Sequence, residues 1–320
     1  SKLVEVATWQ RLDILHAHYA LPHATSAFLA CEILQDARPK LITTIHGTDV
    51  TLVGRDDSYR PITRFSLQKS DAITSPSDWL AETAQQQIGL DASKPIEVIN
   101  NFVDTRVLRP TADDPAAQLK RRRRRARLFA KDKTDAPIIA HVSNFRPIKR
   151  TLDVVEIFAA VVARRPARLL LIGDGPERSR TESRIRELGL GDHVHCAGQV
   201  DHVHELLPLA DLLLLPSELE SFGLVALEAA ACCVPTVASA VGGLGEVIAD
   251  GETGLLIAVG DVPAFAQAVV ELLGAPVRLA AMGRAARTRA ETSFDVGPTV
   301  DRYEALYRRV LAKPWPTTCP

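Results

Sequence analysis

The sequence contains no apolar stretch close to the ~20 residues that a helix needs to span a bilayer. Its first residues, SKLVEVATWQRLD, lack the basic and then apolar layout of a signal peptide. The formal net charge is -1, so the chain as a whole exerts no field that would recruit nucleic acid or an anionic membrane. We therefore expect a cytoplasmic protein whose partners include neither a membrane nor nucleic acid, and any anion site must be local.

Cysteine is scarce, and its distribution excludes the common metal and disulfide frameworks. The chain has five cysteines, an odd number without metal-ligand spacing, and Cys232 and Cys233 are adjacent in an apolar helical run. We expect reduced, mostly buried thiols. Among the nine histidines, His16 and His18 would share one face of a strand, but no carboxylate stands at a useful spacing from them. The sequence therefore predicts neither a metal ion nor a cofactor.

Short apolar runs, in contrast, alternate with helical patterns over all 320 residues. This alternation indicates an α/β fold with parallel sheets covered by helices, and the length is enough for two domains. The first part has four such runs, with helical stretches near residues 23–36, 62–70 and 78–88. These runs are DILHAHY, KLITTIHG, DAITSPS and IEVINNFVD. A second series of six begins at residue 138, and it consists of IIAHVSN, ARLLLIGDG, HVHCAGQV, DLLLLPS, VPTVASAV and GLLIAV.

The two series of strands predict two doubly wound domains. We place the first domain at residues 1–108, a proline-rich and charged linker with one basic helix at 109–136, and the second domain at 137–292. Residues 293–320 are expected to form a helix and tail that return to the first domain. The first domain has few strands, and the strand near residue 13 already has the pattern of an internal strand. We therefore expect the opening strands of this domain to be missing.

The linker contains a run of arginines, Arg121 to Arg125, which has two interpretations. A basic run can bind nucleic acid, but here no aromatic residues interleave with the arginines and the net charge is near zero. The favoured interpretation is a solvated helix face.

Polar residues follow the predicted strands in both halves. His18 and Tyr19 follow the first run, residues 46–49 follow the second, and Ser143, Gly173 and residues 216–218 follow strands of the second series. Ligands of parallel sheets bind outside the carboxyl ends of the strands. Two domains with polar strand ends suggest a substrate cleft between them.

The segment PSELESFGLVALEAAACCVPTVAS, residues 216–239, is the richest in candidate ligands. Glu220 and Glu228 are separated by seven residues, and Ser221-Phe222-Gly223 opens the helix between them. Free N–H groups at a helix start suit a phosphate or sugar oxygens, and glycine allows close approach. Glu228 can bind both hydroxyls of a ribose, or it can merely complement the helix dipole.

The segment SNFRPIKR places Arg146, Lys149 and Arg150 just beyond a buried strand. Cations at this point can bind a diphosphate without a metal, and the alternative is a basic surface turn. The segments GDGPE and AVGGLGEVI add glycine-rich loops near the same sheet edge.

Taken together, these motifs resemble glycosyltransferase family 4. The C-terminal half carries HVSNFRPIKR, LLLIGDGPE, AGQV, ADLLLLPSELESFGLVALEAAACCVPTVAS, VGGLGEVI and DGETGLL in family order, over about residues 138–260. The pair Glu220 and Glu228 corresponds to the Glu, seven residues, Glu motif of the family. The resemblance implies a GT-B fold of two facing Rossmann-like domains and a retaining transferase that uses a UDP-sugar. The opening strand and glycine-rich loop of the family are not found in this sequence.

A narrower resemblance, to the malate-using branch of the family, rests on HAHYALPHA, TTIHGTDVTLVG, YRPITRFSLQKSD and SNFRPIKR. Asn144 stands where many family members have an arginine, as it does in that branch. The resemblance implies transfer of GlcNAc from UDP-GlcNAc to the hydroxyl of L-malate, the first step of bacillithiol biosynthesis, by a monomer or a homo-oligomer that needs no metal.

The resemblance also implies roles for particular residues in a front-face mechanism, in which the leaving UDP phosphate helps to deprotonate the acceptor. It implies catalytic roles for His46, Lys149 and Glu220. Donor binding falls to Ser143, Asn144, Arg146, Lys149, Gly173, Val200, Glu220, Phe222, Gly223, Leu224, Val225 and Glu228. Because malate has two carboxylates, its pocket needs a guanidinium and hydroxyls, and the candidates are Tyr19, Thr44 and Arg64.

Alternatives remain for several of these roles. His46 can instead be a structural histidine, and Arg64 can form an ion pair with Asp49 or Asp71. The chain can also be a family 4 transferase with another acceptor, such as an inositol or a lipid sugar, or a non-catalytic binder of nucleotide sugars.

Overall fold

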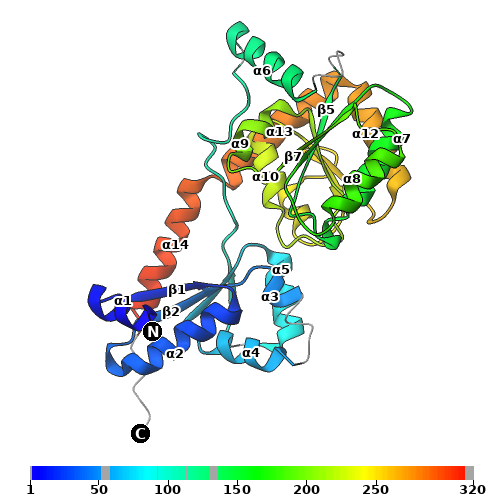
Figure 1. Ribbon diagram of the computed structural model, residues 1–320. Helices are drawn as coiled ribbons and strands as arrows, with labels where there is room; N and C mark the ends of the chain where they lie inside the picture. Colours follow the sequence, from blue (N-terminus) through cyan, green and yellow to red (C-terminus); the bar gives the residue numbers. More distant parts are fainter. Residues whose placement is uncertain (1, 52–57, 92, 113, 130–135, 314–320) are drawn as a thin grey trace. The chain divides into compact units, whose positions relative to one another are not determined.

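The computed structural model describes residues 2–51, 58–91, 93–112, 114–129 and 136–313. Its internal contacts divide the chain into two units, one made of residues 1–101 and 297–320 and the other of residues 102–296. The first unit is therefore discontinuous in sequence. Each unit is built around one parallel sheet (Figure 1).

The sheet of the first unit has the strand order β1-β2-β3-β4, and all neighbouring strands run parallel. The strands are β1 (Ile14–His18), β2 (Lys40–Thr44), β3 (Ala72–Ser75) and β4 (Ile96–Val98). The helices are α1 (Lys2–Gln10), α2 (Thr25–Leu34), α3 (Thr48–Thr51), α4 (Arg60–Gln68), α5 (Asp78–Ala84) and α14 (Val296–Leu311). Short helical turns η1 (Ala20–Ala24), η2 (Gln35–Ala37) and η3 (Gln85–Gly89) complete the connections.

Strand β2 carries the core of the first unit because it is buried on both faces. Neighbouring residues of a strand point to opposite faces of the sheet. Leu41 packs into a cluster with Cys31 of α2, whereas Ile42 packs with Leu306 and Val310 of α14. A helix from the first part of the chain and a helix from its last part thus cover the same sheet (Figure 1).

The sheet of the second unit has the strand order β10-β9-β8-β5-β6-β7, again with all neighbours parallel. Its strands are β5 (Ile138–Val142), β6 (Arg168–Ile172), β7 (Val194–Gly198), β8 (Leu212–Leu215), β9 (Thr236–Ser239) and β10 (Gly254–Ile257). Its α-helices are α6 (Pro115–Leu128), α7 (Thr151–Val162), α8 (Arg178–Glu187), α9 (Val203–Leu206), α10 (Leu224–Ala231), α11 (Leu244–Val247), α12 (Val262–Gly274) and α13 (Pro276–Ser293). Two short 3-10 turns, η4 (Pro147–Lys149) and η5 (Leu207–Leu209), join them.

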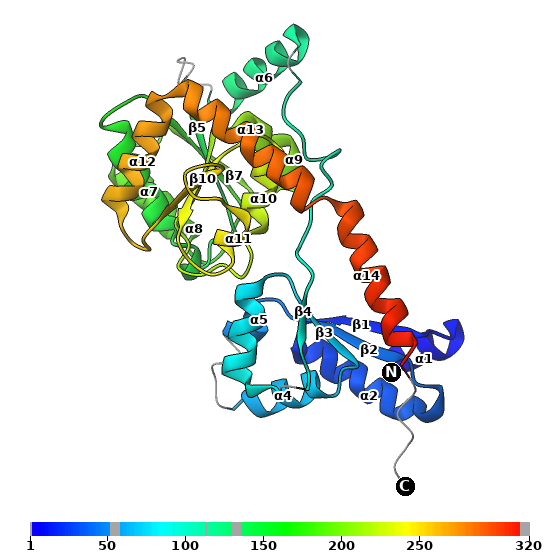
Figure 2. The ribbon, with the colours of Figure 1, turned by 180° about the vertical axis from the view of Figure 1, so that it is seen from behind.

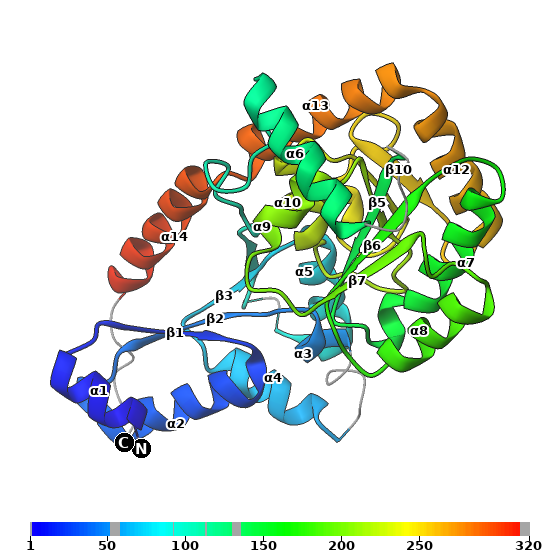
Figure 3. The same ribbon diagram turned by 45° about the horizontal axis from the view of Figure 1, so that its top comes forward.

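The four leucines of β8 supply the core of the second unit on both sides of the sheet. Leu212 and Leu214 pack with the apolar faces of α7 and α12, and Leu213 and Leu215 pack with α10 and α13. Figures 2 and 3 show these two helix layers on opposite sides of the strands. Each fully buried leucine contributes roughly 1.5–3 kcal/mol to folding, so β8 is a major source of the stability of this unit.

Helices α12 and α13 follow each other closely near the end of the second unit. No single helix in the described residues is long and apolar enough to cross a membrane. The two helices together reach that length and composition, but they are bent by 102° where they meet.

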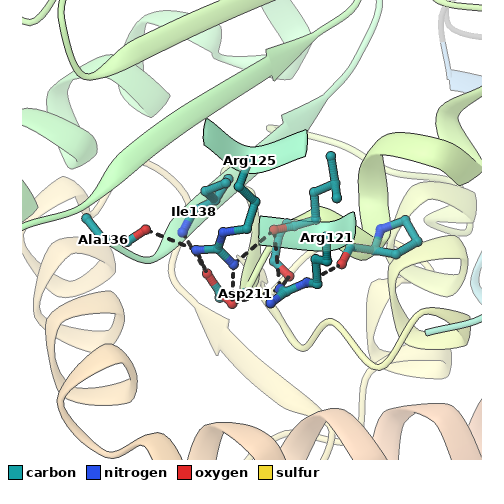
Figure 4. A network of polar contacts seen from close by, with 8 residues as sticks. Arg121, Arg125, Ala136, Ile138 and Asp211 are labelled. Carbon is teal, nitrogen blue, oxygen red and sulfur yellow. Dashed lines mark hydrogen bonds and ion pairs between the residues drawn. The ribbon is translucent and has the colours of Figure 1, made fainter. Parts of the chain in front are cut away.

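The basic helix α6 is fastened to the sheet by a network of polar contacts (Figure 4). Arg125 is buried and donates to both carboxylate oxygens of Asp211, at 3.0 and 2.8 Å, while Arg121 donates to Asp211 Oδ1 at 3.0 Å. Asp211 also accepts from the backbone N–H of Ile138 at 2.8 Å, at the start of β5. The prediction of a solvated helix face is therefore wrong for Arg121 and Arg125, because both side chains anchor α6.

The predicted α/β class is confirmed, and each apolar run of the sequence forms a strand in a parallel sheet. Helix α1 was not among the predicted elements, because the pattern before residue 13 is too short and too mixed to show a helix period. The division into units groups α14 with the first unit and α6 with the second.

Candidate functional site

The second unit contains a cavity of about 560 Å³ at the carboxyl ends of β5, β6 and β8. Nine predicted donor-binding residues line it, namely Ser143, Asn144, Lys149, Gly173, Glu220, Gly223, Leu224, Val225 and Glu228. Five further lining residues were not predicted, namely Val142, Asp174, Gln199, Val203 and Leu215. The loops after these three strands and the segment after β7, which contributes Gln199, thus meet where the rule for open parallel sheets places a ligand.

Glycine shapes one wall of this cavity by allowing two loops to approach closely. Gly173 has φ +121°, and a Cβ at this position would lie 1.8 Å from the carbonyl oxygen of Ser143. Gly175 has the same role, since its Cβ would lie 2.0 Å from the carbonyl oxygen of Asn144. The chain after β6 therefore requires glycine to lie against the chain after β5.

A buried histidine orients Ser143 at this wall. His141 lies on β5, and its Nδ1 is 2.9 Å from the carbonyl oxygen of Leu214. Because a carbonyl only accepts, Nδ1 carries the proton and Nε2 accepts from the Ser143 hydroxyl at 2.9 Å. The Ser143 Oγ in turn accepts from the N–H of Phe145. Burial lowers the pKa of His141 to about 4, so this network is uncharged near neutral pH.

Lys149 and Glu220 form an ion pair inside the cavity. Lys149 Nζ donates to Glu220 Oε1 at 2.7 Å, and the Ser217 hydroxyl donates to the same oxygen at 2.8 Å. Lys149 is 23% exposed and Glu220 14% exposed, so the pair is partly shielded from water. The backbone of Glu220 is fixed by Gly242, where a Cβ would lie 1.8 Å from the Glu220 carbonyl oxygen. The cation and the carboxylate therefore neutralise each other in the cavity.

The start of helix α10 forms another part of the cavity. Gly223 precedes the helix with φ +97°, and a Cβ here would lie 2.5 Å from Leu244 Cδ2. Leu224 and Val225 belong to the first turn, whose N–H groups have no acceptor within the helix. These N–H groups and the positive end of the helix dipole favour an anion or hydroxyl oxygens.

Glu228 lies one turn further along α10 and also lines the cavity. Burial raises the pKa of its carboxyl to about 7. No hydrogen bond or ion pair of Glu228 is found in the described residues, although the group is mostly shielded from water. A pair of ligand hydroxyls would satisfy this carboxylate, whereas a role restricted to the helix dipole leaves it unpaired.

Three of the predicted donor residues do not line the cavity with their side chains. Arg146 is exposed to solvent, and Phe222 is buried in the core with its ring 5.7 Å from that of Phe294. Val200 packs against the same core, while its neighbours Gln199 and Val203 line the cavity.

In the first unit, the polar ends of β1 and β2 lie next to each other. His18 ends β1 and pairs in register with Thr44, so His46 follows β2 close to it. His18 Nδ1 and His46 Nε2 are 2.8 Å apart, and the Tyr19 ring lies 4.9 Å from the ring of His46. Asp49 holds the loop because its carboxylate accepts from the N–H groups of His46 and Ala20, each at 2.9 Å.

Burial shifts the pKa values of two residues in this cluster, His46 and Asp49. It lowers the pKa of His46 to about 4, with a further contribution from His18. It also raises the pKa of Asp49 to about 6, although hydrogen bonds from backbone N–H groups oppose that rise. The imidazole of His46 is therefore neutral near pH 7.

Two of the predicted acceptor residues are held by other parts of the first unit. Thr44 is buried, and its hydroxyl is 2.7 Å from His16 Nε2 and 2.6 Å from Thr74 Oγ1. Its hydroxyl is thus engaged within the protein. The Nε of Arg64 donates to the carbonyl oxygen of Ile88 at 2.8 Å.

The structure contains neither of the ion pairs considered for Arg64. Asp49 is occupied by backbone N–H groups, and Asp71 instead lies 3.6 Å from both Arg38 and Lys40. Among the described residues, the guanidinium of Arg64 is therefore positioned by the carbonyl of Ile88 and not by Asp49 or Asp71.

In the part of the chain that the structure describes, no group of three or more His, Cys, Asp or Glu residues is arranged to hold a metal ion. His16, His18 and His46 of the first unit contact one another directly, ring to ring and, for His18 and His46, nitrogen to nitrogen.

Comparison with known families and proteins gives matches over most of the chain. The family model described as "Glycosyl transferases group 1" matches residues 123–289, and the model described as "Glycosyltransferase Family 4" matches residues 1–107. N-acetyl-alpha-D-glucosaminyl L-malate synthase of Bacillus anthracis is 40% identical over 311 residues, which cover 97% of this chain and 78% of that protein. D-inositol 3-phosphate glycosyltransferase of Mycolicibacterium paratuberculosis is 31% identical over 313 residues, which cover 93% of this chain and 67% of that protein.

Solved structures show the same fold. Sucrose-phosphate synthase of Thermosynechococcus elongatus has a TM-score of 0.78 and 27% identity, over 97% of this chain and 78% of that one. Anabaena Alr3699/HepE in complex with UDP-glucose has a TM-score of 0.81 and 21% identity, over 96% of this chain and 81% of that one.

Proposed function

Because the chain belongs to glycosyltransferase family 4, a family of retaining UDP-sugar transferases with the GT-B fold, we propose that it transfers GlcNAc from UDP-GlcNAc to the hydroxyl of L-malate. The product is the one made in the first step of bacillithiol biosynthesis, and we place the reaction in the cytoplasm. The donor half of the proposal is carried by one observation, the cavity that joins the Lys149–Glu220 pair, the start of α10 and Glu228, which has no partner among the described residues.

The parts of UDP-GlcNAc fit the chemistry of this cavity. The Glu228 carboxylate accepts hydrogen bonds from the two ribose hydroxyls, and uracil lies against Gln199 and Val203. The diphosphate binds at the start of α10 with Lys149 as its cation, so no metal is needed. Glu220 then accepts from hydroxyls of the sugar once Lys149 has turned to the diphosphate.

The proposed reaction proceeds on one face of the sugar. The bond between C1 and the β-phosphate oxygen breaks, and the malate oxygen forms the new bond to C1 on the same side. The leaving phosphate oxygen takes the proton of the malate hydroxyl, so UDP is released and the configuration at C1 is retained. Lys149 and the N–H groups of α10 stabilise the negative charge that grows on the diphosphate. The neutral imidazole of His46 contacts a hydroxyl of the reacting sugar.

Support for L-malate as the acceptor comes from the 40% identity to the malate synthase of Bacillus anthracis. Tyr19, whose side chain is exposed beside His46, supplies a hydroxyl. Arg64 supplies a guanidinium, since its Nη atoms have no described hydrogen bond. The hydroxyl of Thr44 is buried, so Thr44 contributes to the acceptor site indirectly, through its hydrogen bond to His16.

Release of UDP from UDP-GlcNAc by the purified protein tests the acceptor. We expect release that depends on L-malate and persists in the presence of a chelator. Release that depends on D-inositol 3-phosphate and not on malate would assign the other acceptor, which the 31% identical relative uses by name. Calorimetric binding of UDP without turnover on either acceptor would instead indicate a nucleotide-sugar binder.

A further inference from the structure

Three histidine rings form a row at the edge of the sheet in the first unit. His16 and His18 share one face of β1, and their rings stack with centroids 4.7 Å apart and planes at 20°. The next ring is that of His46, with its centroid 5.1 Å from that of His18. His18 Nδ1 and His46 Nε2 are joined by a hydrogen bond of 2.8 Å. The orientation of His46 therefore depends on the ring before it.

The inner end of this row is fixed by both nitrogens of His16. Its Nδ1 is 2.7 Å from the hydroxyl oxygen of Tyr307 on α14, and its Nε2 is 2.7 Å from Thr44 Oγ1. Thr44 is itself held by Thr74 on β3 at 2.6 Å. With both nitrogens engaged, the ring of His16 cannot rotate without losing a hydrogen bond, and it provides a fixed surface on which His18 stacks.

The bond between His18 and His46 also restricts where protons lie. Two imidazole nitrogens 2.8 Å apart share a single proton, so one of them donates and the other accepts. Loss of His18 would leave the Nε2 of His46 without this partner. Asp49 fixes the backbone N–H of His46 but makes no described contact with its ring, so it does not replace His18.

We infer that His18 is a positioning residue for His46, and that Tyr307 on the helix α14 anchors the row through His16. This inference rests on the proposed role of His46 beside the reacting sugar. Neither His18 nor Tyr307 is placed in contact with the donor or the acceptor. Their removal should therefore affect turnover more than binding.

Four substitutions test the inference. His18→Leu removes the hydrogen bond to His46, and His18→Asn retains a polar atom near the position of Nδ1. Tyr307→Phe removes the hydroxyl that holds His16. Tyr303→Phe is the matched control, because this ring lies on the same helix with its centroid 5.6 Å from that of His16 but makes no described hydrogen bond to it.

We expect His18→Leu to lower kcat about 10- to 100-fold through misplacement of His46, with KM for both substrates changed less than about 2-fold. Tyr307→Phe should lower kcat about 2- to 10-fold, the effect of one hydrogen bond. His18→Asn should recover most of the rate, and Tyr303→Phe should match the unsubstituted protein. A raised KM together with an unchanged kcat in His18→Leu would overturn the inference.

A second readout does not depend on turnover. The ¹⁵N resonance of His46 Nε2 should shift in His18→Leu, shift less in Tyr307→Phe and stay unchanged in Tyr303→Phe. UDP affinity, measured in the same samples, reports that the second unit is intact. An unmoved His46 resonance in His18→Leu overturns the inference and leaves the proposed function standing. A shifted resonance in a protein that fails to use malate supports the inference and refutes the proposed acceptor.

Discussion

The two units handle charge in opposite ways around their polar strand ends. In the second unit, opposite charges are paired, Lys149 with Glu220 in the cavity at the carboxyl ends of the strands and Arg125 with Asp211 at the amino ends of β5 and β8. In the first unit, the row of histidines is uncharged near neutral pH, because burial lowers the pKa of both His16 and His46 to about 4. A charged ligand can exchange one ion pair for another in the second unit, while the histidine row of the first unit offers hydrogen bonds without a positive charge.

Breaking the anchor pair should have the largest effect. Asp211→Asn leaves the buried Arg125 without its carboxylate, and we expect a loss of about 3–5 kcal/mol in the free energy of unfolding. Denaturant unfolding followed by circular dichroism measures this loss. The matched control is Glu205→Gln, which breaks the more exposed pair with Arg124 and should cost less than about 1 kcal/mol. Equal losses in the two variants would show that burial does not set the strength of the anchor.

The contribution of the Arg125–Asp211 pair to the free energy of unfolding should also depend on pH in the unsubstituted protein. Burial alone would raise the pKa of Asp211, but the hydrogen bonds and charge of Arg125 outweigh it, and the pKa is lowered. A lowered pKa gives stability that is complete above the unfolded-state value and is lost as the pH falls through the folded-state value. The difference in stability between the unsubstituted protein and Asp211→Asn should therefore shrink in acid.

Breaking the pair in the cavity should act on catalysis. Lys149→Ala removes the cation proposed for the diphosphate and leaves Glu220 facing it, so we expect kcat/KM for UDP-GlcNAc to fall about 100- to 1,000-fold. Steady-state rates of UDP release measure the effect. Arg146→Ala is the control, because this exposed side chain does not line the cavity and should change the rate little. A comparable loss in Arg146→Ala would return Arg146 to the diphosphate site.

The smallest expected effect is a pH dependence of UDP binding in the second unit, where Glu228 titrates near neutral pH and His16 and His46 of the first unit do not. Burial raises the pKa of Glu228 to about 7, and the ionised form is the one proposed to accept from the ribose hydroxyls. UDP affinity measured by calorimetry should therefore rise about 10-fold from pH 6 to pH 8, as the ionised fraction increases. In Glu228→Gln the affinity should be lower and should change with pH only as far as the terminal phosphate of UDP, with a second pKa of about 6, gains charge. A pH dependence in the unsubstituted protein no greater than that in Glu228→Gln would favour a role for Glu228 at the helix dipole alone.

Much of the fold was predictable because each strand is a local pattern. The run DLLLL, for example, shows β8 directly, and its leucines alternate between the two helix layers. Lys149, Glu220 and Glu228 were also predictable as neighbours, since each follows or flanks a strand end of one parallel sheet. Strand order and the parallel arrangement bring these segments together without any knowledge of side-chain contacts.

The residues that escaped prediction depend on contacts between distant parts of the chain. His141 looks like one more position in a buried strand, and its partner, the carbonyl of Leu214, is on another strand. Arg125 and Asp211 are 86 residues apart, so the arginine run gave no sign that two of its members are anchors. Tyr307 meets His16 across 291 residues. No local pattern encodes such pairings.

The discontinuity of the first unit has a consequence for the order of synthesis. Strand β2 leaves the ribosome early, but Leu306 and Val310, which cover Ile42, are made only after the whole of residues 102–296. At a usual rate of translation this interval lasts about 10–40 s. During that time one face of the first sheet lacks its helix, while the second unit already has all of its residues. The first unit is therefore completed only after the second, and the nascent protein depends on α14 to cover an apolar surface.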